Sequence, residues 1–488
     1  MSERNRKRLV SILKNKVLHY IFSRYATYLV QFVNSLLIAA YLGPYYLGIW
    51  GFITLIIQYL NQMNLGISHS VNAIIAIHKH KEWYAQKVIG ASISMLICLA
   101  CLVVLFFVAN ELFLFEIGSK YGFSKYAPMV AAIGILGYFN TLFCNIFRIY
   151  GRLLEIAFSQ TVFPVLMLLA ILLFKGESLL WALTITNLLA IGISFGLFVV
   201  RVPVKIKPLF IPRLFKAIQI KGWYLFVYNA SFYMILISTR SFVSSYYSVS
   251  EFGYFTFAFT LAHAVLLLLD SFSFIIYPKL LNRLASASIE KISALLAILR
   301  NTYITTSHLL VHTVILFFPL FLLFFPQYEE SKQAFRLIAL TLALYASSFG
   351  YSGLLIAKEE EKKLSYAALG ALVINIATAW FLTAVLSATF AQIIIATMLA
   401  YLFFVFVAGY MGSKHIKLPQ RFFPIINNIF PSQLLAPCLL TLCLTIFQVG
   451  DIYFIAPLLL FVIFNHKAIV ALKNISKIVA INANLINI

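Results

Sequence analysis

The sequence predicts an all-α polytopic membrane protein with about 14 transmembrane helices. The chain is 62% hydrophobic, and only 11% of its residues are charged, against about 25% in ordinary soluble domains. Its apolar residues form runs long enough for a helix to cross the hydrocarbon layer. Its 37 Lys and Arg residues, against 15 Asp and Glu, collect in every second gap between those runs. This alternation is the positive-inside pattern, which indicates orientation as well as class.

Each apolar run has the length that one membrane-spanning helix needs, about 20 residues. The predicted helices are 18–41, 45–66, 88–109, 127–147, 153–174, 179–200, 223–246, 254–277, 302–325, 334–357, 364–386, 389–411, 432–449 and 452–471. Pro437 and Pro457 interrupt the last two runs. We therefore expect these two helices to be the least regular of the set.

The basic residues predict the topology. Of the 37 Lys and Arg residues, 30 fall on one side of the predicted membrane and five on the other, and Arg24 and Arg240 lie inside helices. The rule places the basic side in the cytoplasm, so we expect a bacterial inner-membrane protein with both termini cytoplasmic. Basic loops of this kind contact anionic lipid headgroups. Membrane lipids are therefore expected partners, and nucleic acid is not.

The predicted helices divide into two halves and a tail. The longest basic gap, 201–222, has six predicted helices before it, and six more lie between it and the basic gap from Lys414 to Arg421. We expect an N-terminal lobe (1–200), a basic cytoplasmic linker (201–222), a C-terminal lobe (223–412) and a C-terminal helix pair (413–488).

A short internal similarity supports two related six-helix lobes. The segment 41–50 lies between the first two helices and the segment 246–255 between the seventh and eighth, with Gly48 and Gly253 in register. Because each half has an even number of helices, both halves share one orientation. This predicts a pseudo-two-fold axis along the membrane normal, with a substrate site between the halves.

Polar residues recur every three or four positions in four predicted helices and so mark one face of each. The candidate cavity residues are Arg24, Gln31, Asn34, Gln58, Asn61, Asn229, Tyr233, Arg240 and Tyr345. Stripes on corresponding helices of the two halves indicate a hydrated central cavity. The alternative for any neutral member is an interhelical hydrogen bond.

The two arginines inside predicted helices raise the free energy of membrane insertion. An Arg at a helix centre costs about 2.5–3.5 kcal/mol on insertion scales. Arg24 and Arg240 either extend to a membrane interface or face water or an anion. The planar guanidinium suits phosphate, because it offers paired donors.

Four titratable side chains are candidates for ion coupling. Asp270 is the only carboxylate deep in a predicted helix, and His263 lies seven positions earlier. His308 and His312 are spaced i and i+4 on another helix. Chains of Asp and His carry protons in transporters, so a proton or sodium ion is the expected coupling ion. The alternative is a static hydrogen bond that stabilises packing.

Other chemistry is not indicated. Cys98 and Cys101 have the spacing of a redox or metal motif, but no other ligand residue is near them, and all five cysteines are expected to face lipid or pack between helices. No nucleotide-binding motif occurs. We expect no catalytic residue, no metal site and no cofactor. The short predicted external loops also disfavour a membrane glycosyl polymerase or ligase.

A family resemblance rests on ordered motifs. These are Arg24, Leu42-Gly43-Pro44-x-x-x-Gly48, Asn64-Leu65-Gly66-Ile67-Ser68, Arg148-x-x-Gly151-Arg152, Arg240, Glu251-Phe252-Gly253-Tyr254, Tyr277-Pro278-Lys279-Leu280 and Phe325-Pro326-x-Tyr328. In order and spacing, over most of residues 20–412, the chain resembles the polysaccharide-transporter branch of the multidrug/oligosaccharidyl-lipid/polysaccharide exporter superfamily, especially Wzx-type O-antigen flippases. At Asn64 the family often has Asp.

The resemblance implies two lobes that alternate access and move an undecaprenyl-diphosphate-linked oligosaccharide from the inner to the outer leaflet. It also implies glycan polymerase and chain-length regulator proteins as partners. Many Wzx-type proteins are described with twelve helices, whereas fourteen is the number in lipid II flippases of the same superfamily. Drug-exporting members often use a carboxylate in helix one, where this chain has Arg24. A cation-coupled multidrug exporter is the alternative within the superfamily.

Overall fold

The computed structural model describes residues 16–78, 81–113, 117–204, 206–418 and 421–481, and this part of the chain contains helices but no strand. The first half contains α2 (Lys16–Gln62), α3 (Ile67–His78), α4 (Glu82–Phe113), the 3₁₀ turns η1 (Ser119–Tyr121) and η2 (Phe123–Lys125), α5 (Ala127–Ile149), α6 (Leu153–Leu173) and α7 (Gly176–Val200). The second contains α8 (Pro212–Tyr246), α9 (Val249–Ser286), α10 (Ile289–Leu322), η3 (Pro326–Ser331), α11 (Lys332–Ala346), α12 (Tyr351–Ala357), α13 (Glu361–Trp380), the π-helical η4 (Phe381–Val385), α14 (Ile394–Ser413), α15 (Phe422–Ile429), α16 (Ser432–Ile446), η5 (Asp451–Phe454) and α17 (Ile455–Ile481).

The all-α membrane class predicted from the sequence is confirmed. Among the described residues, nine helices are long and apolar enough to cross a membrane, or 11 when each of two bent helix pairs is taken as one span. This count takes α2 as one helix, although α2 contains two predicted spans. The count also leaves out α8 and α9. With these, every predicted span falls on helical structure, but the predicted helix 334–357 is wrong as a single helix, because it is divided between α11 and α12 at a 41° bend.

The chain forms two compact units, which divide between Phe226 and Val227. This division lies inside α8, a few residues beyond the expected linker (201–222). The second part of that segment is already helical, because α8 begins at Pro212. Proline fits the first helical position, since its missing N–H has no intrahelical partner there.

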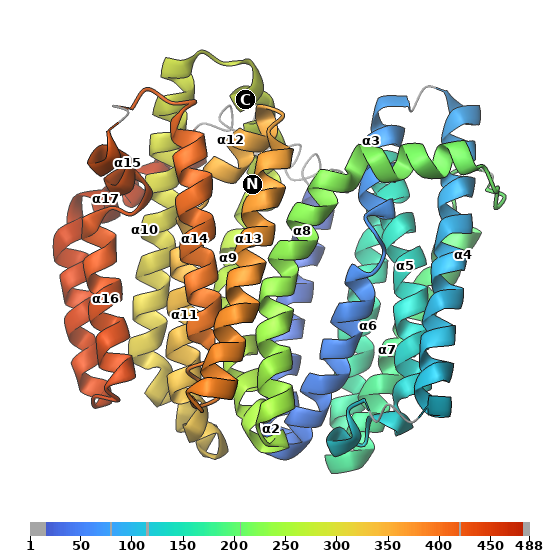
Figure 1. Ribbon diagram of the computed structural model, residues 1–488, viewed down its shortest axis with the longest axis horizontal. Helices are drawn as coiled ribbons and strands as arrows, with labels where there is room; N and C mark the ends of the chain where they lie inside the picture. The colour runs from blue at the N-terminus through green and yellow to red at the C-terminus, as the bar shows by residue number, and fades with distance from the viewer. Residues whose placement is uncertain (1–15, 79–80, 114–116, 205, 419–420, 482–488) are drawn as a thin grey trace, which may run out of the picture. The chain divides into compact units, whose positions relative to one another are not determined.

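In unit 1, α2 packs against α5, α6 and α7, and α3 and α4 pack against α5 (Figure 1). α2 is broken at Gly43, whose φ of 67° and ψ of 175° lie outside the helical region. Glycine adopts positive φ without the steric cost that a Cβ brings. Pro44 follows and lacks a backbone donor. The Gly43-Pro44 pair therefore separates the two predicted spans.

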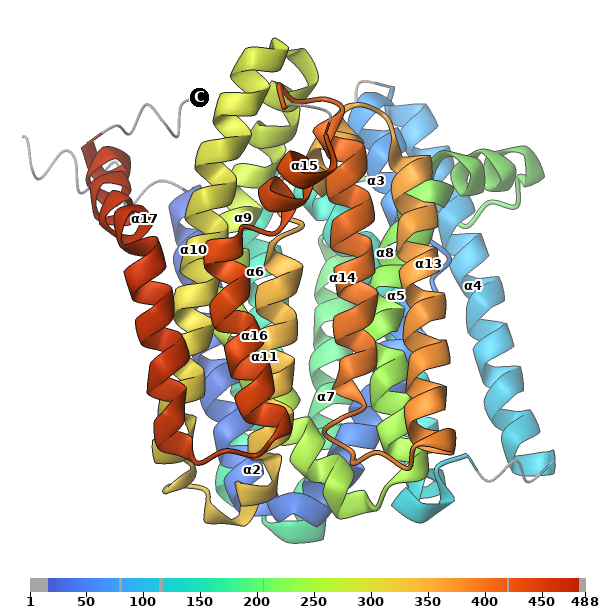
Figure 2. The ribbon, with the colours of Figure 1, turned by 60° about the vertical axis from the view of Figure 1, so that its left-hand side comes forward.

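In unit 2, the corresponding connection between α8 and α9 uses a capping box. The Ser248 side chain accepts a hydrogen bond from the backbone N–H of Glu251, whose side chain accepts one from the backbone N–H of Ser248. Beyond this start, α9 packs against α11 and α12, and α14 packs against α11 and α13. Figure 2 shows α16 and α17 as an antiparallel pair beside α10.

A buried arginine supports the break between α11 and α12. Arg300, on α10, donates hydrogen bonds to the backbone carbonyls of Ser347 (2.7 Å), Phe349 (2.8 Å) and Asn428 (3.2 Å). Its guanidinium also lies 3.9 Å from the ring centre of Tyr351. A helix that ends leaves carbonyls without helical partners, and a buried carbonyl has little water to replace them. Arg300 satisfies these groups and neutralises the negative end of α11.

An ion-pair network joins the start of α11 to the turn before α17. Asp451 lies 3.0 Å from Nζ of Lys332 and 2.5 Å from Nη2 of Arg336. Arg336 is 5% exposed, and its guanidinium lies 3.9 Å from the ring centre of Phe454. The network therefore ties the C-terminal helix pair to α11.

Candidate functional site

The polar centre of unit 2 is a buried hydrogen-bond network between α8, α13 and α14. The amide of Asn375, on α13, donates to the carbonyl of Ile235 (3.0 Å) and to the hydroxyl of Ser238 (2.8 Å). Thr239 donates to the Asn375 amide oxygen over 3.2 Å, and its hydroxyl lies 2.7 Å from that of Thr397 on α14. A fully satisfied buried network of this kind fixes the relative positions of the helices that share it.

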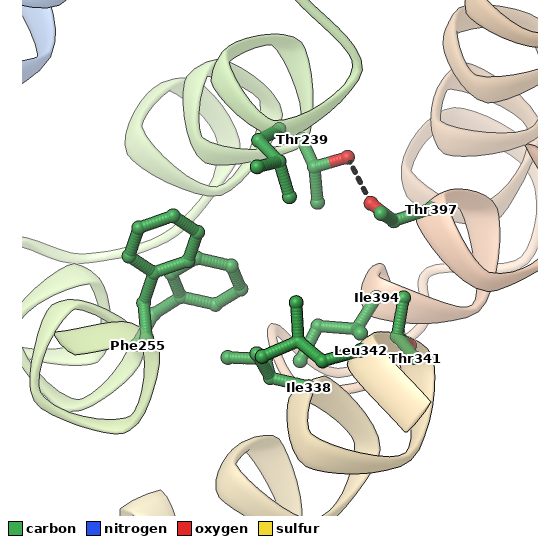
Figure 3. A pocket seen from close by; sticks show the side chains of 9 residues that line it. Thr239, Phe255, Ile338, Thr341, Leu342, Ile394 and Thr397 are labelled. Atoms are coloured by element: carbon green, nitrogen blue, oxygen red, sulfur yellow. Dashed lines mark hydrogen bonds between the residues drawn. The ribbon is translucent and has the colours of Figure 1, made fainter. Parts of the chain in front are cut away.

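Figure 3 shows a small pocket beside this network. Thr239 and Thr397 face one another at one side of it, and Phe255, Ile338 and Ile394 line the remainder. Phe259 of α9 also lines the pocket. The pocket is therefore mainly apolar, with its hydroxyl groups on α8, α11 and α14.

Arg240 lies close to Phe259, one of the residues that line this pocket. It is 3% exposed, and its guanidinium carbon is 5.0 Å from the ring centre of Phe259 and 5.8 Å from that of Phe252. Aromatic faces stabilise a cation by about 2 kcal/mol or more where water is excluded. The α8–α9 packing therefore holds the Arg240 guanidinium buried beside two aromatic rings.

His263 belongs to the same group of side chains. Its ring lies 4.0 Å from the ring of Phe259, and its Nδ1 is 2.9 Å from the Phe259 carbonyl oxygen. His308 and His312 have different neighbours, because they face α16 and α17. The structure thus separates His263 from the other two histidines. Asp270 lies on α9, but its side chain is outside the described residues.

The other candidates of unit 2 lie along α8 and α11. Asn229 and Tyr233 are half-buried on α8. Tyr345 of α11 packs in an aromatic cluster, with ring centres 4.9 Å from Phe232 and 5.0 Å from Tyr401. Tyr345 therefore contributes to the α8–α11–α14 packing.

In unit 1, Arg24 and Asn34 lie on one helix but have different roles. Arg24 is half-buried, donates from Nε to the hydroxyl of Tyr28 (2.7 Å), and lies 5.4 Å from the centre of that ring. Asn34 is fully buried and donates to the carbonyl of Pro164 on α6 (2.7 Å). Asn34 thus makes an interhelical hydrogen bond, the alternative that the sequence left open.

The remaining candidates of unit 1 are partly accessible. Gln31 and Gln58 are half-buried and Asn61 is exposed. Asn61 lies against α5 at Gly137, where a Cβ atom would be 2.8 Å from the Asn61 amide oxygen. Small residues permit such close approach of helices in membranes.

The sequence reasoning missed three buried polar groups. The sequence did not single out Arg300 or Asn375, and it predicted that Cys438, like the other cysteines, faces lipid or packs between helices. Asn375 is the only side-chain amide within the predicted span 364–386, a signal that could have marked it. Cys438 carried no comparable signal, because its neighbours come from α10, far away in sequence.

Comparison with known proteins gives a match in structure. No protein-family model matches the sequence, and no curated protein is similar to it in sequence. A structure of the lipid II flippase MurJ, in an inward closed conformation, matches with a TM-score of 0.66 and 13% identity, over 92% of this chain and 98% of that one. An inward-facing multidrug resistance MATE family transporter of the MOP superfamily matches with a TM-score of 0.63 and 15% identity, over 80% and 94%.

A third structural match is also to a transporter of this superfamily. It is a MOP superfamily transporter from Pyrococcus furiosus, described as having a binding pocket of reverse polarity, with a TM-score of 0.51 and 15% identity over 81% of this chain and 93% of that one. At these identities the likeness concerns the fold. This chain is a multi-pass membrane protein with the fold of MOP superfamily transporters.

Proposed function

We propose that this protein is a flippase that moves an undecaprenyl-diphosphate-linked oligosaccharide, an O-antigen or related repeat unit, across the bacterial inner membrane by alternating access. The observation that carries the proposal is the charge of the first long helix in each half. α2 contains Arg24 and α8 contains Arg240 within the apolar stretch, and neither helix contains an Asp or Glu. Such helices favour an anionic substrate over a cationic one.

A lipid diphosphate carries about two negative charges, and an unpaired ion is very costly in a low-dielectric layer. A transporter must therefore offer positive charge along the path. Arg24 and Arg240 supply it, each beside an aromatic ring. The larger share of this chain that the lipid II flippase matches, 92% against 80% for the MATE transporter, also favours a lipid-linked substrate. Glycan polymerase and chain-length regulator proteins are the proposed partners.

We expect Arg24→Ala and Arg240→Ala to reduce surface glycan and to leave lipid-linked precursor in the inner leaflet. Loss of a hydrogen-bonded charge contact of about 1.5–3 kcal/mol corresponds to roughly 10–100-fold weaker substrate binding. Lysine at either position keeps the charge but not the paired donors, so it should retain part of the function. The measurement is surface glycan in a bacterial strain that lacks its own flippase, with membrane expression determined in parallel.

Arg213→Ala is the matched control, because Arg213 is exposed at the start of the same helix as Arg240; it should leave glycan unchanged. Wild-type glycan from both well-expressed Ala variants would refute the proposal. If the native chain instead gives drug resistance without glycan export, the multidrug alternative is correct.

We propose that coupling uses a proton or sodium gradient and the carboxyl group of Asp270. The proposal is supported by the position of Asp270 as the only acid in the apolar predicted span 254–277. We expect Asp270→Asn to abolish gradient-driven transport in proteoliposomes while the amount of folded protein is unchanged. The Asn amide has nearly the size of the carboxyl group but carries no negative charge and no proton that can be exchanged during transport. Full transport by the Asn variant, under an imposed pH or sodium gradient, would assign Asp270 to packing alone.

A further inference from the structure

Three side chains that can bind a metal meet inside unit 2, between α10 and α16. Nδ1 of His308 lies 3.3 Å from Sγ of Cys438, and Nε2 of His312 lies 3.9 Å from the same sulfur. One ligand atom from each of the three residues lies within 4.8 Å of the others. Two helices far apart in sequence thus present two imidazoles and one thiol to a common point.

The separations fit a shared metal ion. Bonds of about 2.3 Å to sulfur and 2.0 Å to nitrogen, at trigonal or tetrahedral angles, place those two atoms roughly 3.5–3.7 Å apart. The two sulfur–nitrogen distances, 3.3 and 3.9 Å, lie on either side of that value. The sulfur–nitrogen distances would therefore change by only a few tenths of an ångström on binding. The two nitrogens, which lie within 4.8 Å of each other, would come to roughly 3.3–3.5 Å.

The ligands are buried and one of them is oriented from outside. His308 and His312 are each 2% exposed and Cys438 is 4% exposed. The hydroxyl of Thr441 lies 3.3 Å from Nδ1 of His312, which leaves Nε2 directed at the sulfur. A hydrogen bond to the second ring nitrogen is the usual means of fixing a histidine that binds a metal. The cluster thus has a supporting group as well as ligands.

Charge selects the ion. The ring of Phe461 lies against both imidazoles, and Ile304 and Leu434 complete an apolar cluster with it. A divalent ion on one thiolate and two neutral imidazoles would bury a net charge of +1, which is costly in such surroundings. A monovalent ion gives a neutral site. Sulfur and imidazole ligands are those that monovalent copper prefers.

We propose that His308, His312 and Cys438 bind one Cu(I) ion that joins α10 to α16. When the copper–sulfur bond forms, the Cys438 thiol proton leaves, so one positive charge enters, one departs and no oxidation state changes. The ion stabilises the attachment of the C-terminal helix pair to the rest of unit 2. This proposal is independent of the transported substrate.

The test uses the purified full-length protein in detergent micelles without oxygen, with Cu(I) supplied as its coloured bathocuproine disulfonate complex. We expect transfer of one copper per chain, which the loss of colour measures. X-ray absorption should show one sulfur and two nitrogen neighbours. Cys438→Ser and His308→Gln should weaken binding by at least about 100-fold, and Thr441→Val, which removes only the orienting hydroxyl, by about tenfold.

Cys443→Ser is the control, because Cys443 lies on the same helix but is exposed; it should bind copper as the native chain does. Copper uptake that Cys438→Ser does not reduce, or a copper shell without sulfur, would overturn the proposal. Stoichiometric zinc retained in preference to Cu(I), when both are offered, would overturn the choice of a monovalent ion. The absorption measurement on the native chain decides the matter even if a variant fails to fold.

Discussion

Arg300→Met is expected to lower the free energy of unfolding by about 3–5 kcal/mol. The native guanidinium serves three backbone carbonyls and covers the face of Tyr351. Methionine keeps the length of the apolar stem but donates nothing, and each buried acceptor left without a partner costs about 1–3 kcal/mol. The measurement is denaturant unfolding in detergent micelles. Arg300→Lys should give an intermediate loss, since one ammonium cannot reach all three carbonyls in the geometry of the fork.

Lys291→Met is the matched control for this prediction. Lys291 lies on the same helix, α10, and is exposed, so its loss should change the free energy of unfolding by less than about 0.5 kcal/mol. A stability of Arg300→Met within about 1 kcal/mol of the native protein would contradict the role assigned to Arg300. Proteolysis between α12 and α15 should become faster in the variant, because Arg300 also binds the Asn428 carbonyl.

Asp451→Asn is expected to destabilise unit 2 by about 1–3 kcal/mol, which is less than for a fully buried pair because Asp451 is 38% exposed. The loss arises mainly because Arg336, 5% exposed, keeps its charge without its carboxylate partner. Removing the Arg336 charge as well should restore part of the lost stability. Because Asp451 also pairs with Lys332, the double variant Arg336→Met/Asp451→Asn should be somewhat less stable than Arg336→Met alone. Its loss of stability should still be smaller than the sum of the two single losses, with a coupling energy above about 1 kcal/mol.

The pair Lys125–Glu177 provides the comparison for this cycle. Its atoms are 3.7 Å apart and its side chains are 62% and 56% exposed, so the same double-mutant cycle should give a coupling energy below about 0.5 kcal/mol. Strict additivity at Arg336 and Asp451 would show that the network contributes no more than that solvated pair. Both cycles use denaturant unfolding in the same micelles.

Hydropathy predicted the helices well because a membrane imposes them. Backbone groups in lipid must be paired within the segment, so each apolar run of sufficient length became helical, including those that contain Pro437 and Pro457. The break at Gly43 was also visible, because glycine and proline adjoin there. The helical extension of α8 back to Pro212 was not expected, since the segment is basic and rich in proline.

The polar stripes were predicted, but the groups that they contact were not. Asn34 and Arg24 lie on the same predicted helix, yet Asn34 binds the carbonyl of Pro164, while Arg24 binds Tyr28 one turn away. Spacing identifies a face of a helix but not what that face meets. Hydropathy cannot separate a surface that packs on a neighbouring helix from one that faces lipid, because both are apolar.

The sequence by itself determined the class, the positions of the apolar helices and the signs of charge within them, because these follow from segment length and from the cost of a charge in lipid. Only the tertiary structure decided which of those groups meet. In the folded chain, Arg300 binds the carbonyls at the break between α11 and α12, Asp451 lies beside Arg336, and Cys438 lies against His308. These contacts join residues 47 to 130 positions apart, and only helix packing brings them within bonding distance.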